Sequence, residues 1–163
     1  MPDLQIIQFD PRWRADFARL NIEWLQRWFV VEPIDAQVLG DPETHILAGG
    51  GRVLFAVATD AAGCERVVGT VALKHEGEGI YELTKMAVAP DMRGGGIGRQ
   101  LLQASVETYR ALGGRELFLE SSSQLQAALK LYESAGFVHH PAPRPGSHYD
   151  RADVYMVWTP APH

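Results

Sequence analysis

Large apolar residues recur at helical spacing near the start of the chain. Asp10 followed by Pro11 is typical of a helix start, because aspartate can cap the first turn and proline lacks the amide hydrogen that would stay unpaired there. Apolar residues then recur at steps of three and four, which keeps them on one face of a helix. They are Trp13, Phe17, Leu20, Trp24 and Trp28. A second, shorter helix is predicted over residues 33–39 and ends at Gly40.

Three β-rich runs follow, over residues 53–59, 66–74 and 80–88. Two short segments of turn-forming residues, 60–63 and 76–79, separate them. Consecutive runs joined by turns of this kind pair as neighbours in a sheet. We therefore predict an antiparallel meander in the middle of the chain.

The second half of the chain alternates between helical and strand patterns. Helical spacing returns over residues 97–112 and ends at a pair of glycines, and residues 117–119 then predict a strand. A capping box at residues 123–126 predicts the start of a further helix, which Gly136 ends. Residues 154–158 form the last predicted strand. Antiparallel strands followed by this alternation predict an α/β sheet of mixed direction.

Length and charge narrow the class of protein. One hydrophobic core commonly holds about 100 to 200 residues, so we expect a single domain over residues 1–163. The formal net charge is −5, whereas nucleic-acid-binding proteins normally carry a basic surplus, so we expect no nucleic-acid partner. No apolar stretch approaches the roughly 18 residues of a membrane span, and the first residues lack a basic leader. We therefore expect neither secretion nor a membrane partner.

Cysteine and histidine usage argues against a metal site. Cys64 is the only cysteine, which excludes an intramolecular disulfide and a Cys-rich zinc site and favours a reducing, cytoplasmic location. His139 and His140 are adjacent, so they would point to opposite sides of a strand, and no nearby acid has ligand spacing. We predict no bound metal.

The most informative segment is a glycine-rich loop between a predicted strand and a predicted helix. Glycines at positions 94, 95, 96 and 98 let backbone amides approach one ligand at a helix N-terminus, where the helix dipole favours an anion. Arg93 and Arg99 flank these glycines and add positive charge. A P-loop is excluded because Gln100, rather than serine or threonine, follows the basic residue, and the glycine spacing also differs from the dinucleotide fingerprint. The pattern predicts a diphosphate site, because a simple turn needs one glycine rather than four.

These residues resemble a known family. Arg93-x-x-Gly96-x-Gly98, placed after a β-meander, is similar to the acetyl-CoA signature of GCN5-related N-acetyltransferases (GNAT), and residues 131–137 (LYESAGF) are similar to that family's second motif. Leu125 departs from the pattern, because many members have an asparagine there. The resemblance implies a mixed, mainly antiparallel central sheet with helices on both faces, splayed between strands four and five. It also implies acetyl-CoA as the cosubstrate.

By the same resemblance, the backbone at residues 86–88 pairs with the pantetheine arm and residues 93–99 hold the diphosphate. The implied cofactor residues are Met86, Ala87, Val88, Arg93, Gly94, Gly95, Gly96, Ile97, Gly98 and Arg99. Glu82 is the implied base for the amine, and the alternative is a surface acid paired with Lys85. Tyr132 is the implied acid that protonates the CoA sulfur, and the alternative is a packed core tyrosine.

By the same resemblance, the acceptor site is built from the first two helices, the ends of strands four and five, and the loop before the last strand. The candidates are Trp28, Glu32, Asp35, Tyr81, Ser121, Tyr149 and Arg151. Trp28 could equally belong to the core, and Glu32 and Asp35 could equally be surface acids at helix ends. The acidic residues favour a cationic amine as acceptor. Arg151 would bind a carboxylate on it, unless it pairs with a neighbouring aspartate.

We therefore expect a cytoplasmic, acetyl-CoA-dependent N-acetyltransferase. It would move the acetyl group to a primary amine of a small molecule, amino acid or peptide by direct attack in a ternary complex. The alternatives are a non-catalytic acyl-CoA-binding or sensor module on the same fold, and a structural subunit of an assembly. A homodimer is compatible with the sequence.

Overall fold

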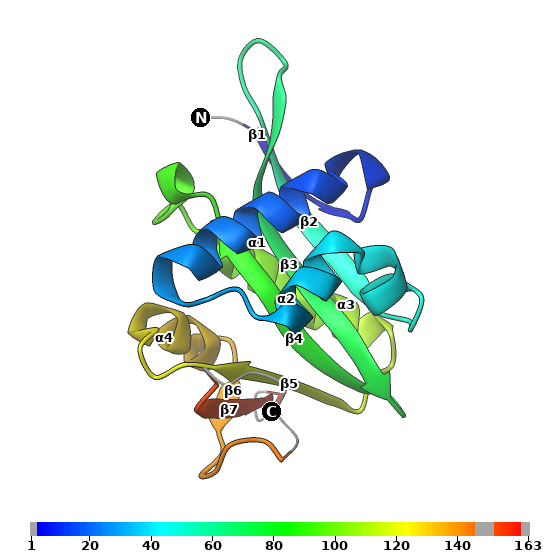
Figure 1. Ribbon diagram of the computed structural model, residues 1–163, viewed down its shortest axis with the longest axis vertical. Helices are drawn as coiled ribbons and strands as arrows, with labels where there is room; N and C mark the ends of the chain where they lie inside the picture. The colour runs from blue at the N-terminus through cyan, green and yellow to red at the C-terminus, as the bar shows by residue number, and fades with distance from the viewer. Residues whose placement is uncertain (1–2, 146–151, 161–163) are drawn as a thin grey trace.

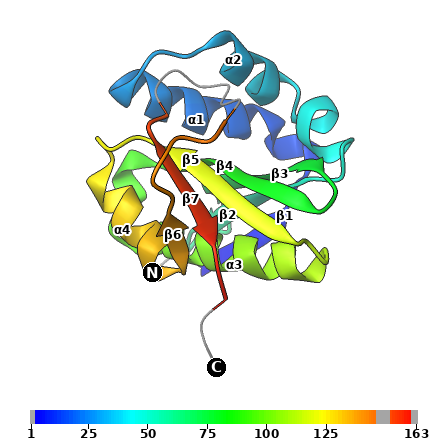
Figure 2. The same cartoon turned by 90° about the horizontal axis from the view of Figure 1, so that it is seen from below.

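The computed structural model describes residues 3–145 and 152–160, and these form one mixed sheet with helices on both faces (Figures 1 and 2). The strand order is β1-β2-β3-β4-β5-β7-β6. The strands are β1 (Asp3–Gln8), β2 (Arg52–Thr59), β3 (Glu65–Gly77), β4 (Ile80–Val88), β5 (Glu116–Ser121), β6 (Phe137–His139) and β7 (Val154–Trp158). Every neighbouring pair is antiparallel except β4 and β5, which are parallel. This topology confirms the predicted mixed, mainly antiparallel sheet.

Two pairs of helices cover opposite faces of the sheet. In Figure 2, α1 (Arg14–Trp28) and α2 (Pro33–Gly40) lie on one side, and α3 (Ile97–Ala111) and α4 (Gln126–Ser134) lie on the other. Short helical turns complete the described chain: η1 (Pro11–Trp13), η2 (Glu43–Leu47) and η3 (Pro90–Met92). The predicted cap is present, since Asp10 accepts a hydrogen bond from the Arg12 amide at 3.0 Å. This cap lies at the start of η1, which leads directly into α1.

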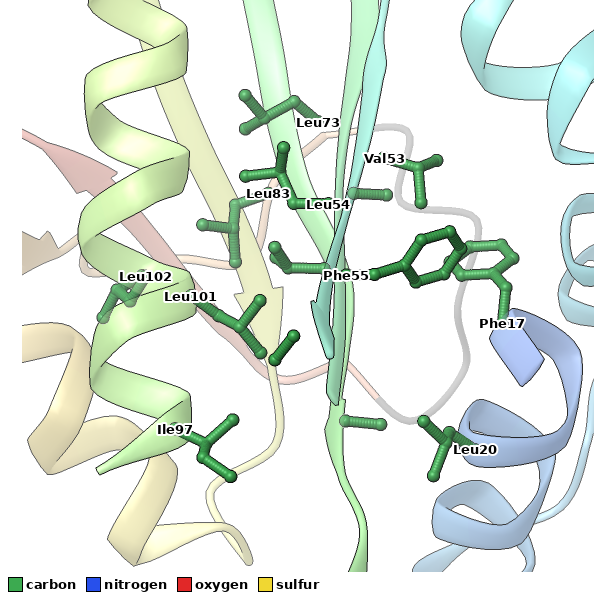
Figure 3. Packing of buried hydrophobic residues seen from close by; sticks show 14 of the residues in the cluster. Phe17, Leu20, Val53, Leu54, Phe55, Leu73, Leu83, Ile97, Leu101 and Leu102 are labelled. Carbon is green, nitrogen blue, oxygen red and sulfur yellow. The ribbon is translucent and has the colours of Figure 1, made fainter. Parts of the chain in front are cut away.

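The core lies between the sheet and the apolar faces of α1 and α3. Figure 3 shows Phe17 of α1 against Phe55 of β2, and the two rings meet edge to face with centroids 6.5 Å apart. On the other face, α3 comes so close to β3 that a Cβ on Gly69 would lie 2.8 Å from Leu101. Leu101 is fully buried. This close packing fixes α3, and therefore its N-terminal end, relative to β4.

Strand β4 is irregular at the point where it leaves β5. Its pairing with β5 covers only residues 80–82, so the later part of β4 separates from its neighbour. Its register with β3 shifts between Thr70 and Ala72, and Lys85 has a φ of +55°, which is rare for a residue with a side chain. This bulge and the short β4–β5 pairing produce the splay that the resemblance implied.

Several details differ from the sequence-based predictions, and no pattern predicted β1 or η2. Strand β6 was not predicted, because it has only three residues. Ser123 does not cap α4, which begins at Gln126; the Ser123 hydroxyl instead donates to Asp153 at 2.6 Å, a contact between segments 30 residues apart. Trp28, which the helical pattern placed on the apolar face, lies at the end of α1 and is 44% exposed. A helical pattern identifies the apolar face of a helix but not the point at which other elements stop covering that face.

Candidate active site

A groove follows the glycine loop between the end of β4 and the start of α3. Gly94 and Gly96 both have a φ of +83°, a left-handed conformation that glycine adopts without strain. A Cβ added at either position would meet nothing within 4 Å, so this part of the loop faces open space. The groove is lined by every predicted cofactor residue except Gly95, together with Trp24, Met92 and four α4 residues: Ala127, Ala128, Leu131 and Tyr132.

The groove suits a diphosphate attached to a long, largely uncharged arm. Gly96 precedes the 15-residue helix α3, and no side chain caps that end, so its first amides can receive an anion. Arg93 and Arg99 are exposed beside these amides. Small and apolar side chains of α4 form the opposite wall. These features fit the diphosphate and pantetheine parts of CoA.

A second, smaller cavity lies next to the groove, between α1, β4, β5 and the start of α4. Its volume is about 80 Å³. Its lining residues are Asn21, Trp24, Leu25, Phe29, Glu82, Leu83, Thr84, Lys85, Met86, Leu119, Glu120, Ser121, Ser122, Leu125, Tyr132 and Ala152. Trp24, Met86 and Tyr132 line both spaces, so the cavity and the groove meet at these three residues.

Glu82 is a buried carboxyl group on the cavity wall. Only 6% of its surface is exposed, and burial raises its pKa from 4.5 to about 7, with the negative charges of Glu120 and Glu76 acting in the same direction. Lys85 and Lys74 act against this rise but do not cancel it. A carboxyl group with this pKa gains and loses a proton near neutral pH, as a general base requires.

Lys85 does not pair with Glu82 but with an acid of α2. Its Nζ lies 2.6 Å from Asp35 Oδ1, and both side chains are almost completely buried. Asp35 Oδ2 also accepts a hydrogen bond from the Glu32 amide at 3.0 Å. The alternative that Asp35 is a surface acid is therefore wrong, whereas its place beside the acceptor stays a prediction. Its charge is buried because Lys85 compensates it.

Tyr132 stands where the groove and the cavity meet. Its ring packs edge to face against Phe137, with centroids 6.1 Å apart, and burial raises its pKa to about 12. The phenol is therefore protonated at neutral pH and keeps a hydrogen that it can donate to a ligand.

The structure separates the predicted acceptor residues. Ser121 lines the cavity, whereas Glu32 stands at the start of α2 and Trp28 lies outside the lining. Tyr81 packs on the opposite face of the sheet, where its ring meets Tyr109 of α3 at 6.0 Å. Tyr149 and Arg151 lie outside the described residues.

Several cavity residues were missed by the sequence analysis, Glu120, Trp24 and Phe29 among them. Glu120 lies two positions after Phe118, which pairs with Glu82, so the period of a strand places both acids on one face. Extending the predicted strand beyond residue 119 would have found it. Trp24 and Phe29 form an aromatic pair with centroids 6.0 Å apart, but the helical pattern places Trp24 in the core and carries no signal for a ligand.

The described residues contain no cluster of histidine, cysteine and acidic side chains that could hold a metal ion. Among them, no helix is long and apolar enough to cross a bilayer.

Comparison with known proteins places the chain in a family. The family model described as "Acetyltransferase (GNAT) family" matches residues 12–137. That match covers most of the chain, which therefore belongs to the GNAT acetyltransferases. Membership confirms the resemblance noted from the two motifs.

Individual relatives share parts of the sequence. An uncharacterized N-acetyltransferase of Escherichia coli is 38% identical over 60 residues, which are 37% of this chain and 36% of that protein. An IAA acetyltransferase of Azospirillum brasilense is 34% identical over 106 residues, 64% of this chain and 61% of that protein. The matched part thus spans less than two thirds of either relative.

Solved structures show the same fold over almost the whole chain. A GNAT acetyltransferase from Staphylococcus aureus superposes with a TM-score of 0.82 at 19% identity and covers 96% of this chain and 98% of its own. A putative acetyltransferase from Salmonella typhimurium, solved with acetyl-CoA, superposes with a TM-score of 0.70 at 21% identity and covers 99% of this chain and 98% of its own.

Proposed function

We propose that the protein transfers an acetyl group from acetyl-CoA, bound in the groove, directly to a primary amine bound in the cavity. The observation that carries the proposal is that the two spaces meet at Trp24, Met86 and Tyr132. A donor thioester in one space and an amine in the other can therefore touch. No covalent acetyl-enzyme is then required, and both substrates must be bound together.

The groove residues hold the cofactor in this proposal. The first amides of α3 and the charges of Arg93 and Arg99 bind the diphosphate. The backbone of Met86 and Val88, which separates from β5, pairs with the pantetheine arm. Leu125, where many members of the family have an asparagine, lines the cavity at the start of α4 instead of the groove.

Glu82 and Tyr132 carry the protons of the reaction. Acetyl-CoA supplies the acetyl group as a thioester; the amine nitrogen bonds to its carbonyl carbon and the carbon–sulfur bond breaks. Glu82 accepts the proton that the amine loses, directly or through water, because its pKa of about 7 makes it a base near neutral pH. Tyr132, protonated at this pH, donates a proton to the departing sulfur.

The cavity favours a cationic amine as acceptor. Two carboxyl groups, Glu82 and Glu120, face it, while the charge of Lys85 is balanced by Asp35. The names of relatives, an IAA acetyltransferase and N-alpha-acetyltransferase 30 among them, belong to enzymes with different acceptors. We place the acceptor among small molecules, amino acids and peptides with a primary amine. We further propose that the chain acts as a single acetyltransferase domain in the cytoplasm, where the exposed Cys64 stays reduced.

A panel of primary amines incubated with acetyl-CoA tests the proposal. Release of CoA, read with a thiol reagent, and a mass increase of one acetyl group on the amine are the expected results. The matched control is the Tyr132→Phe, Glu82→Gln double variant, which should bind acetyl-CoA and release no CoA above background. Tight acetyl-CoA binding without transfer to any amine class would support the alternative of a non-catalytic acyl-CoA-binding module.

A further inference from the structure

We infer that Thr70 and Asn21 are positioning residues, which aim the backbone amide of Met86 at the junction of the groove and the cavity. There the amide hydrogen would donate to the thioester carbonyl and stabilise the negative charge that develops on its oxygen. This inference rests on the proposed function, because it concerns the same reaction. Asn21 and Thr70 are a buried polar pair, and neither binds the reacting atoms of the amine or of acetyl-CoA.

Asn21 and Thr70 form a chain of hydrogen bonds with a fixed direction. Asn21 Nδ2 donates one hydrogen to the Phe17 carbonyl and the other to Thr70 Oγ1, both at 2.9 Å. A hydroxyl has a single hydrogen, and Thr70 donates it to the Lys85 carbonyl, also at 2.9 Å. Asn21 and Thr70 are 3% and 0% exposed, so water does not compete for these bonds.

The Lys85 carbonyl belongs to the peptide that the β4 bulge displaces. Thr70 pairs with Ala87 and Ala72 pairs with Thr84, so Lys85 and Met86 lie opposite Val71 alone and the regular ladder is interrupted there. A carbonyl at such a bulge needs another donor, since a buried unpaired carbonyl is costly. The Thr70 hydroxyl supplies that donor, and it therefore selects one orientation of the 85–86 peptide.

When the direction of the Lys85 carbonyl is fixed, the direction of the Met86 amide in the same peptide bond is fixed as well. In a trans peptide the C=O and the following N–H point in opposite directions. No peptide bond of the described chain is cis. With the Lys85 carbonyl directed at Thr70 of β3, the Met86 N–H is directed away from β3, toward the side where β5 has separated. Met86 lines both the groove and the cavity, so this amide belongs to a residue at which the two spaces meet.

Lys85 is also held through its side chain, which reinforces the orientation. Its Nζ pairs with Asp35 on α2 at 2.6 Å, while its carbonyl is bound from β3. Lys85 keeps a φ of +55° under these two constraints. A strained residue held from two sides in this way is typical of a preorganised site. Removing one donor to a developing oxyanion commonly lowers kcat about 10²- to 10³-fold, so misdirecting it should be measurable.

The test compares variants of Thr70 with a buried hydroxyl elsewhere. Thr70→Val keeps the shape but removes the donor, and Thr70→Ser keeps the donor. Ser105→Ala is the matched control, because Ser105 is fully buried and its hydroxyl donates to the Leu101 carbonyl at 2.8 Å within α3, away from the site. Asn21→Ala serves as the second variant should Thr70→Val fail to fold, since it frees the Thr70 hydroxyl to rotate.

We expect Thr70→Val to lower kcat tenfold or more while KM for acetyl-CoA stays within about twofold, and Thr70→Ser to restore most of the rate. The carbonyl carbon of [1-¹³C]acetyl-CoA should move downfield in its NMR spectrum on binding to the wild type and to Thr70→Ser, and less on binding to Thr70→Val. Ser105→Ala should leave both readouts unchanged.

The outcomes separate this inference from the proposed function. Wild-type levels of kcat and of the carbonyl shift in Thr70→Val, or an equal loss in Ser105→Ala, would overturn the role of Thr70 while leaving acetyl transfer to amines intact. If no amine is acetylated but the carbonyl shift still depends on the Thr70 hydroxyl, the positioning role stands and the proposed acceptor chemistry does not.

Discussion

The groove and the cavity are neighbours, but they are built in different ways. The groove consists mainly of one continuous segment, from Met86 to Arg99, which contains the three lining glycines. The cavity collects side chains from α1, β4, β5 and the start of α4, which are far apart in the sequence. The groove can thus accept the same cofactor in many members of a family, whereas the cavity can change its acceptor by replacing single side chains.

The two regions also respond differently to substitution. A glycine in the groove matters because of its φ and the absence of a Cβ, so any side chain there should weaken binding. A cavity residue matters because of its proton or its shape, so an isosteric change that removes only the proton should act on the rate. The predictions below separate binding effects from rate effects.

The largest effect should come from Tyr132→Phe. The substitution keeps the ring contact with Phe137 and removes the proton donor. We expect kcat to fall by roughly 10² to 10⁴, with acetyl-CoA affinity nearly unchanged. Steady-state kinetics together with calorimetry measure both. An unchanged kcat in a folded variant would exclude Tyr132 as the acid.

Glu82→Gln should act on rate and on its pH dependence. The wild-type kcat/KM should bend near pH 7, where Glu82 loses its proton to become the base, and the bend should be absent in the variant, whose rate falls by roughly 10² or more. Glu76→Gln is the matched control: Glu76 raises the pKa of Glu82 from a distance, so its removal should move the bend to lower pH. If the bend in the pH profile persists in Glu82→Gln, it belongs to another titrating group and not to Glu82.

The same carboxyl group should affect stability. The pKa of Glu82 is raised from 4.5 to about 7 in the folded protein, so between these values the native state keeps a proton that the unfolded state has lost. The free energy of unfolding of the wild type should therefore fall relative to Glu82→Gln as pH rises from 4.5 to 7, and stay lower above it. The difference should reach at most about 3 kcal/mol. Urea unfolding at several pH values measures it, and a pH-independent difference would contradict the raised pKa.

A smaller effect is expected in the groove. Gly96→Val places a β-branched residue at a φ of +83° in the open loop, so acetyl-CoA binding should weaken at least tenfold, or about 1.4 kcal/mol. Gly113→Val is the control, because Gly113 has a φ of +70° with open space around it but lies at the other end of α3. Equal weakening by both variants would point to strain rather than to the groove.

The contrast between the contiguous groove and the cavity, which is assembled from distant segments, also explains which features could be predicted from the sequence. The glycine loop, Tyr132 and Glu82 stand in contiguous motifs, and the helices and most strands follow from local periodicity. Asp35 could not be assigned, because its partner Lys85 lies 50 residues away. The side chain of Tyr81 faces α3 instead of the acceptor. Alternation along β4 could have predicted this, because the neighbouring residue, Glu82, faces the cavity.

The central claim is direct transfer between two spaces that meet at Tyr132. Initial rates measured while acetyl-CoA and one accepted amine are varied together test it most directly. A ternary complex predicts double-reciprocal lines that intersect, with no CoA released before the amine is added. Parallel lines, together with a burst of CoA in the absence of amine, would show an acetyl-enzyme intermediate and contradict the account.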